Sequence, residues 1–260
     1  MATRIRGEGE ARPHRARSVN IPIGDIYNAT QWVSLAFGSK VVMLGGRAIN
    51  FWCFKDARPT HDIDVIVERK PTTAELEQLK EIADYGASFV YNGNPESVRG
   101  RVKLFYHNPV VDRRTTGEGM QIDLYYPYYR SAVNNFMPRT DINGLPIQML
   151  LDTSEEISMG RMSMYVVAKE PLTIMKFITW QERGEGLATA KDMRDIKNMF
   201  RNHFDNPHRL HDFIMRATEI LDENMPHRRE EILDGIITHV YSSFDEQMKA
   251  EAKKVLRRAS

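Results

Sequence analysis

The chain of 260 residues carries 36 Lys and Arg against 35 Asp and Glu, and 42% of its residues are hydrophobic. This length and composition allow one large domain or two modest ones with a packed core. The net charge of +1 argues against wholesale wrapping in nucleic acid and leaves room for local basic patches. The single cysteine excludes an internal disulfide, so we expect a reducing compartment and a cytoplasmic protein.

The beginning of the chain is rich in arginine and poor in apolar residues. Residues 1–20 contain five arginines and lack the apolar stretch of a signal peptide. No run elsewhere approaches the roughly 18 apolar residues of a membrane span, so we expect no membrane partner. We predict a flexible Arg-rich tail over 1–20, and an arm that touches RNA is the alternative.

Residues 21–150 alternate between helical and strand-like apolar patterns. In chain order these patterns predict helix 24–37, strand 39–46, helix 47–54, strand 61–68 and helix 72–86. Threonines can cap the last of these helices and Gly86 can end it. Two more strand-like runs, 101–108 and 120–127, flank a turn-rich segment and predict an antiparallel hairpin with a long loop. The expected sheet is therefore mixed.

The second part of the chain is dominated by helical periodicity. After a short strand at 162–168, the pattern predicts helices 170–183, 189–204 and 207–223, and a helix or helix pair over 227–259. We predict an α/β (α+β) fold in which a mixed-sheet domain, 21–150, precedes a mainly helical bundle domain, 151–260.

Two aspartates, Asp62 and Asp64, lie on either side of a single isoleucine in the strand "HDIDVIVE". Alternate residues of a strand share a face, so the two carboxylates lie about 7 Å apart. Their repulsion favours a cation between them, and oxygen ligands on a rigid strand suit Mg²⁺. Asp123, a lone acid in "MQIDLYYP", could complete a site for one or two metal ions and accept a proton from a hydroxyl. The alternative places all three acids on the solvent side of edge strands.

Gly45 and Gly46 close a predicted strand immediately before a helix. Missing side chains let a ligand approach the backbone there, and the first amides of the helix face an anion, so a phosphate could bind. The segment lacks the Lys-Ser/Thr of a P-loop and the third glycine of a dinucleotide fingerprint, which excludes these two nucleotide sites.

The order of these features resembles that of the DNA polymerase β-like nucleotidyltransferase superfamily. The order is apolar-Gly-Gly, a helix, Asp-apolar-Asp on the next strand, and a lone Asp on a later strand. Within this superfamily, "RPTHDID", with Arg58, Thr60 and the two aspartates, is similar to the Arg-x-Ser/Thr-x-Asp-apolar-Asp of AbiEii-type toxins and their uncharacterised relatives. That group also carries a lysine on a helix, then an arginine and a Lys-Asp-x-x-Asp, which here are Lys176, Arg183, Lys191, Asp192 and Asp195. Gly46 stands where many active members have serine.

The resemblance implies a Mg²⁺- or Mn²⁺-dependent nucleotidyltransferase that moves NMP from an NTP to a hydroxyl of an RNA or tRNA end or of a protein. It also implies a toxin with an antitoxin partner. The catalytic and metal-binding residues would be Asp62, Asp64 and Asp123. The nucleotide-binding residues would be Gly45, Gly46, Arg58, Thr60, Lys176, Lys191, Asp192 and Asp195.

Other interpretations stay open from the residues alone. A lysine beside an apolar helix face, such as Lys176, commonly snorkels to water, and Asp192 with Asp195 could belong to a surface ion-pair lattice. Arg58 suits a phosphate and a structural carboxylate equally. The alternative functions are transfer to a small molecule such as an antibiotic, and a catalytically silent regulator that binds a nucleotide.

Overall fold

The computed structural model describes residues 21–54, 58–60, 62–81, 87–92, 101–115, 117–127, 141–184, 187–241, 250 and 253–256. The predicted tail, 1–20, and the predicted helix end at Gly86 lie outside this part of the chain. None of the helices within it is long and apolar enough to cross a bilayer.

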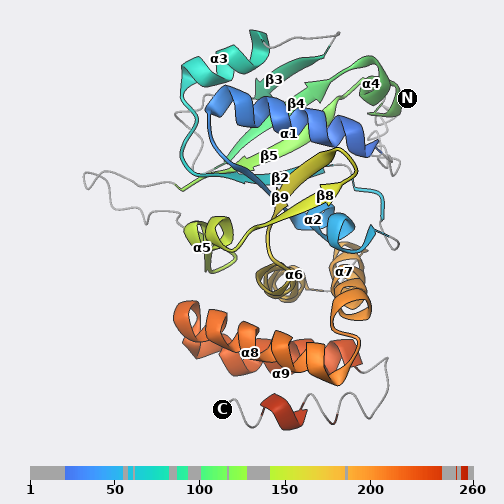
Figure 1. The fold of residues 1–260 in the computed structure, drawn as a ribbon, viewed down its shortest axis with the longest axis vertical. Helices are drawn as coiled ribbons and strands as arrows, with labels where there is room; N and C mark the ends of the chain where they lie inside the picture. The colour runs from blue at the N-terminus through green and yellow to red at the C-terminus, as the bar shows by residue number, and fades with distance from the viewer. Residues whose placement is uncertain are drawn as a thin grey trace, which may run out of the picture.

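A seven-stranded mixed sheet forms the upper half of the molecule in Figure 1. Its strands, in spatial order, are β3 (Ser88–Asn92), β4 (Arg101–His107), β5 (Met120–Tyr125), β2 (Asp62–Val67), β1 (Val41–Leu44), β9 (Met162–Val166) and β8 (Glu155–Met159). The pairs β2–β5 and β1–β9 are parallel and the other pairs are antiparallel. The predicted mixed sheet is confirmed, and so is the antiparallel pairing of β4 with β5.

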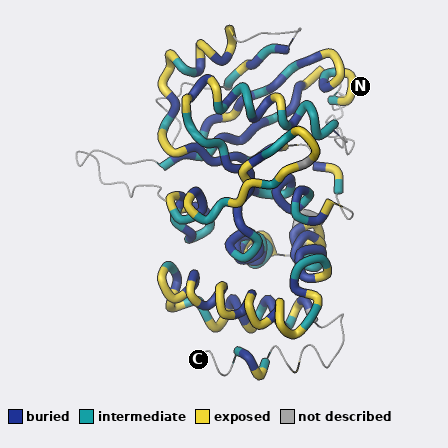
Figure 2. The backbone as a smooth tube through the Cα atoms, in the orientation of Figure 1, coloured by how far each residue is buried: buried dark blue, intermediate teal, exposed yellow. Residues whose placement is uncertain are grey.

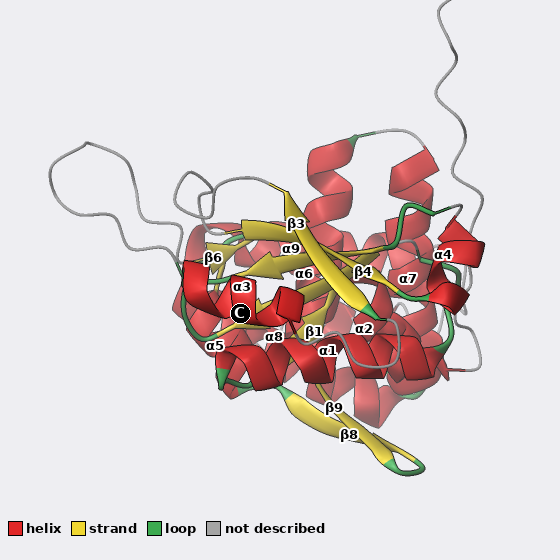
Figure 3. Ribbon diagram, turned by 90° about the horizontal axis from the view of Figure 1, so that it is seen from above, coloured by secondary structure: helices red, strands yellow, loops and turns green. Residues whose placement is uncertain are grey.

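The two edge strands, β3 and β8, have no counterpart among the predicted elements. β8 begins with Glu155 and Glu156, and charged residues on an edge strand hide the apolar alternation by which strands are predicted. Seen from above, the hairpin of β8 and β9 projects from one side of the molecule (Figure 3). A second, two-stranded sheet is formed by β6 (Asp141–Ile142) and β7 (Leu145–Pro146).

Helices pack against the sheet and against one another in layers. They are α1 (Ile23–Phe37), α2 (Gly45–Trp52), α3 (Thr73–Glu81), α4 (Pro109–Thr115), α5 (Ile147–Asp152), α6 (Lys169–Arg183), α7 (Leu187–His203), α8 (Pro207–Asn224) and α9 (Arg229–Tyr241). A 3₁₀ turn, Pro226–Arg228, joins the last two. Below the sheet in Figure 1, α2 contacts α6 and α7, and α8 and α9 form the next layer down. Buried residues follow the central strands, α6 and α7, whereas buried and exposed residues alternate along α8 (Figure 2).

Local signals explain where several helices begin. The predicted threonine cap of α3 is confirmed: the Glu75 amide donates to Thr72 Oγ1 at 3.2 Å, and the Thr72 amide donates to Glu75 Oε2 at 2.7 Å. The connection between β4 and β5, expected to be a loop, contains α4 instead. Asn108 Oδ1 accepts from the amides of Val110 and Val111, and Pro109 occupies the first turn, which together start the helix.

The strand β1 ends at Leu44, and α2 begins at Gly45. The sequence pattern predicted that the glycine pair ends the strand. In the structure the pair instead forms the first turn of the helix. This difference matters for the site, because the amides of the glycines are among the first donors of α2.

Candidate active site

The register of three neighbouring strands brings the predicted acids together. Asp64 in β2 lies opposite Asp123 in β5, and opposite Leu44 at the end of β1. Residues directly opposite in adjacent strands point to the same face, so the two carboxylates share a face of the sheet. Asp62, two residues earlier in β2, shares that face and is exposed, whereas Asp123 is buried. The predicted meeting of the three acids on one sheet face is thus explained by a parallel pairing of β2 with β5.

Gly45 makes a close approach between α2 and the acids possible. Its φ is +70°, a conformation that side chains disfavour, and a Cβ atom at this position would collide with Asp64 Oδ2. Only glycine therefore lets the first turn of α2 touch the Asp64 carboxylate.

Gly46 makes room for the segment that leads into β2. A Cβ atom there would lie 2.9 Å from Thr60 Cγ2 and 3.0 Å from Arg58 Nη2. The space that a serine side chain would need is thus taken by two residues of the "RPTHDID" motif. Thr60 is buried, and its Oγ1 has no hydrogen-bond partner among the described residues.

A network of buried charges joins this motif to the helices. Arg58 binds Asp195 in bidentate fashion, with Nε–Oδ1 and Nη2–Oδ2 both 2.6 Å. Lys176 Nζ lies 3.0 Å from Asp192 Oδ1 and 3.1 Å from Asp195 Oδ2, and Arg183 Nη1 lies 2.7 Å from Asp192 Oδ2. The two carboxylates are almost completely buried, so the alternative of a surface ion-pair lattice is wrong. The sequence left open whether Arg58 binds a phosphate or a structural carboxylate. In the structure it binds a carboxylate, that of Asp195.

Lys176 also faces the acids of the sheet. A cavity of about 170 Å³ is lined by Gly45, Asp64, Tyr125, Lys176 and Arg183, among other residues. Its walls therefore include parts of β2, β5, the start of α2 and α6. Only 12% of the Lys176 side chain is exposed, so its ammonium group is held within the protein and does not snorkel to bulk water.

Charge repulsion is concentrated on Asp64. Burial, together with the nearby carboxylates of Asp62 and Asp123, raises the pKa of Asp64 to about 7. Lys176 and Arg101 lower the pKa but do not offset these effects. Asp64 therefore exchanges a proton near neutral pH in the protein without metal.

Asp123 is held by residues that are not part of the sequence motifs. Arg101 Nη2 lies 2.5 Å from Asp123 Oδ2, and Gln121 Nε2 lies 3.1 Å from both carboxylate oxygens. Tyr125 extends this group, because its hydroxyl lies 3.4 Å from Asp64 Oδ1. Gln121 and Tyr125 flank Asp123 at i−2 and i+2 in "MQIDLYY", so strand alternation could have placed both on its face.

The acids do not form a ready-made metal site in the structure. In the part of the chain that the structure describes, no three His, Cys, Asp or Glu side chains converge as metal ligands. Lys191 is exposed on α7, while Asp192 beside it is buried. The metal-binding role of the three acids and the nucleotide-binding role of Lys191 stay predictions.

Three solved structures are similar to this chain at low sequence identity. JHP933 from Helicobacter pylori is similar at 13% identity and a TM-score of 0.44, covering 92% of this chain and 95% of that one. An antigenic nucleotidyltransferase-like protein from Paracoccidioides brasiliensis is 16% identical, with a TM-score of 0.41 and coverage of 78% and 91%. The antibiotic-resistance factor ANT(2'')-Ia is 12% identical, with a TM-score of 0.43 and coverage of 79% and 98%. A search of curated proteins found no match.

The class of the protein, a nucleotidyltransferase, is shown by a match to a family model. Residues 31–259 match the family model "Nucleotidyl transferase AbiEii toxin, Type IV TA system". The chain belongs to this family of toxins of type IV toxin–antitoxin systems, as the motif resemblance had predicted.

Proposed function

We propose that the protein transfers NMP from an NTP to a hydroxyl of an RNA or tRNA end or of a protein, with the help of Mg²⁺ or Mn²⁺. The observation that carries this proposal is the position of Asp64. It lies opposite Asp123, against Gly45, and in one cavity with Lys176. Carboxylates, backbone amides and a lysine around one space match the needs of a metal-bound triphosphate.

The residues present fit a divalent cation held with the substrate. Mg²⁺ is commonly bound by one or two carboxylates together with substrate phosphates and water, so an acidic pair is sufficient. Asp62 and Asp64 form such a pair, and the pKa of Asp64 is raised first by burial and then by the charges of Asp62 and Asp123, which a cation would balance. When bound, the cation supplies charge neutralisation at the phosphates.

The triphosphate would be held by groups from both halves of the chain. The first amides of α2, at Gly45 and Gly46, are suited to phosphate oxygens. Lys176 and Arg183 face the same cavity and add positive charge. Arg58, Thr60, Asp192 and Asp195 would orient these groups, and Lys191, exposed beside Asp192 on α7, would add positive charge.

In the proposed reaction the acceptor oxygen forms a bond to the α-phosphorus of the NTP, and pyrophosphate leaves. Asp123 accepts the proton of the acceptor hydroxyl. Its contacts with Arg101 and Gln121 fix the carboxylate, so that it is positioned before the acceptor arrives. The family adds an antitoxin as the expected partner.

The test is a labelling experiment with purified protein. Each α-³²P-labelled NTP is incubated with Mg²⁺ and either total RNA or a protein extract, and an aminoglycoside is included as a small-molecule acceptor. We expect label on RNA or protein with the parent chain and none with Asp64→Asn. Label on the aminoglycoside alone would favour the antibiotic-type alternative, and no label with any acceptor would favour a silent nucleotide-binding protein.

A further inference from the structure

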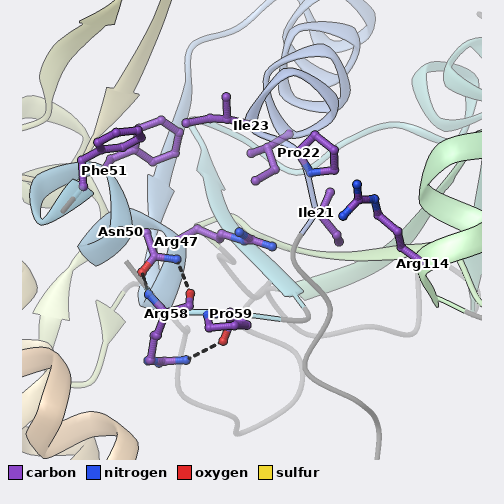
Figure 4. A pocket seen from close by; sticks show the side chains of 11 residues that line it. Ile21, Pro22, Ile23, Arg47, Asn50, Phe51, Arg58, Pro59 and Arg114 are labelled. Carbon is purple, nitrogen blue, oxygen red and sulfur yellow. Dashed lines mark hydrogen bonds between the residues drawn. The ribbon is translucent and has the colours of Figure 1, made fainter. Parts of the chain in front are cut away.

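A second pocket, of about 400 Å³, shares none of its described lining residues with the cavity at Asp64. It lies where the start of α1, one side of α2 and the segment before β2 meet the end of α4 (Figure 4). Its volume is within the range of sites that take small organic ligands.

Positive charge dominates this pocket. Its described lining includes Arg47, Arg58 and Arg114, and no Asp or Glu. Arg58 already has a carboxylate partner in Asp195, which balances its charge and occupies two of its donor nitrogens, so binding of an anion would depend on Arg47 and Arg114. Such a lining favours an anion.

Arg47 is the buried member of this set. Only 5% of it is exposed, and its Nη2 donates to the Thr60 carbonyl at 2.7 Å, while Nε has no partner among the described residues. Burial lowers the pKa of Arg47 to about 10, although attraction to Asp62 partly opposes this shift. A guanidinium that is taken out of water with one donor unused is costly unless an anion compensates it.

Arg47 and Arg114 approach the pocket from different helices. Figure 4 shows the guanidinium end of Arg47 extending from α2 and that of Arg114 extending from α4 toward the region of Ile21. Two guanidinium groups that converge from separate elements are suited to the several oxygens of a phosphate.

The remaining wall is apolar and includes an exposed aromatic ring. Phe54 is 67% exposed, so much of its ring is open to solvent at the pocket. Ile21, Ile26 and Phe51 line the pocket as well. An anionic group next to an aromatic surface matches a nucleotide, because a base stacks on such a ring.

We propose that this pocket binds a nucleotide phosphate between Arg47 and Arg114, with the base against Phe54. A free mononucleotide and the 5′-phosphorylated end of an RNA strand offer the same chemistry. The proposal does not depend on nucleotidyl transfer, since the site needs neither the acids nor a metal ion.

The experiment is calorimetric titration of the full chain in EDTA, which removes the divalent cation required at the acidic site. AMP should bind, and adenosine should bind at least tenfold more weakly, because it lacks the phosphate. Arg47→Met and Arg114→Ala should each weaken AMP at least tenfold. Phe54→Ser should weaken AMP but leave the affinity for inorganic phosphate unchanged.

Arg113→Ala is the matched control, since Arg113 is exposed beside Arg114 on α4 and does not line the pocket. It should leave AMP affinity within twofold of the parent chain. Arg114 is exposed too, so its replacement keeps the test valid if Arg47→Met fails to fold. Equal AMP affinity in Arg114→Ala and Arg113→Ala would overturn the proposal. Loss of AMP binding in Lys176→Ala with full binding in Arg114→Ala would also overturn it, because the phosphate would then sit at Asp64.

The source of the phosphate is distinguished with short RNA strands. A 5′-phosphorylated strand that binds at least tenfold more tightly than both AMP and the 5′-hydroxyl strand would assign the pocket to an RNA end. Similar affinities for AMP and the phosphorylated strand would assign it to a mononucleotide. Equal binding of the phosphorylated and hydroxyl strands, with no response to Arg114→Ala, would contradict a phosphate site of either kind.

Discussion

Replacement of Lys176 by methionine tests the charged side of the proposed nucleotide site. Methionine replaces the apolar stem of the lysine with one of similar length and removes the ammonium group, and Lys176 lines the cavity with Asp64. A charge-assisted hydrogen bond contributes about 1.5–3 kcal/mol. We therefore expect NTP affinity to fall about 10- to 150-fold, since each 1.4 kcal/mol corresponds to a factor of ten.

The same change has a calculable effect on folding. Lys176 bonds Asp192 at 3.0 Å and Asp195 at 3.1 Å, but each carboxylate keeps an arginine, Arg183 and Arg58 respectively. Removing one partner of a fully buried pair costs about 3–5 kcal/mol when it leaves a charge alone. Because neither carboxylate is left alone, we expect the free energy of unfolding to fall by less, about 1.5–3 kcal/mol.

Both quantities are measurable on one protein preparation. Calorimetry with a non-hydrolysable NTP analogue and Mg²⁺ gives the affinity, and urea denaturation gives the free energy of unfolding. Lys80→Met is the matched control, because Lys80 is exposed on α3 and pairs with Glu77. If Lys176→Met kept the parent affinity with an unchanged circular dichroism spectrum, Lys176 would have only the structural role of neutralising two buried carboxylates.

Three further outcomes follow from the acidic strands. Asp123→Asn should leave NTP binding nearly intact and slow transfer to the acceptor found by labelling by about 10²-fold or more, the usual scale for losing a general base; transfer near the parent rate would exclude that role. Gly45→Ala should weaken Mg²⁺-dependent NTP binding at least tenfold in calorimetry, because the new methyl group displaces the Asp64 carboxylate; unchanged affinity would show that this carboxylate does not hold the metal. Because the pKa of Asp64 is raised to about 7, the carboxyl is protonated below that pH, and the proton competes with the cation. Mn²⁺ affinity should therefore fall up to about tenfold per pH unit between pH 7 and 5 and lose most of this dependence in Asp64→Asn.

The acidic pair could be predicted because strand geometry is local. A period of two residues is enough to place Asp62 and Asp64 on one face without knowledge of the neighbouring strands. The register of Asp123 opposite Asp64 is different, since it follows from a parallel pairing between β2 and β5, which are separated by α3, β3, β4 and α4 in the chain. No local pattern specifies that pairing, so the sequence indicated that a third acid could join the pair but not the strand register that places it there.

The partners of the acids were missed for a related reason. Arg101 begins β4 and contacts Asp123 across the β4–β5 pair. A single arginine at the start of a strand is usually exposed to solvent, so the sequence contains no sign that Arg101 makes this contact. Its functional position becomes visible only when the antiparallel register is known. The same holds for Gly46, whose lack of a side chain is explained by Thr60 and Arg58, residues that follow after a helix and a turn.

The buried network shows most clearly how the two halves of the chain depend on each other. The spacing of Asp192 and Asp195 places both on one face of α7, which is equally typical of a solvated surface. Burial of that face requires compensating charge, and it comes from Arg58, before β2, and from Lys176 and Arg183 on α6. Arg58 and Asp195 are 137 residues apart, so the segment that leads into the acidic strand is fixed by a helix of the second half. The acids of the proposed site therefore come from the sheet, and most of the cations that face them come from α6. Neither half of the chain contains the site alone.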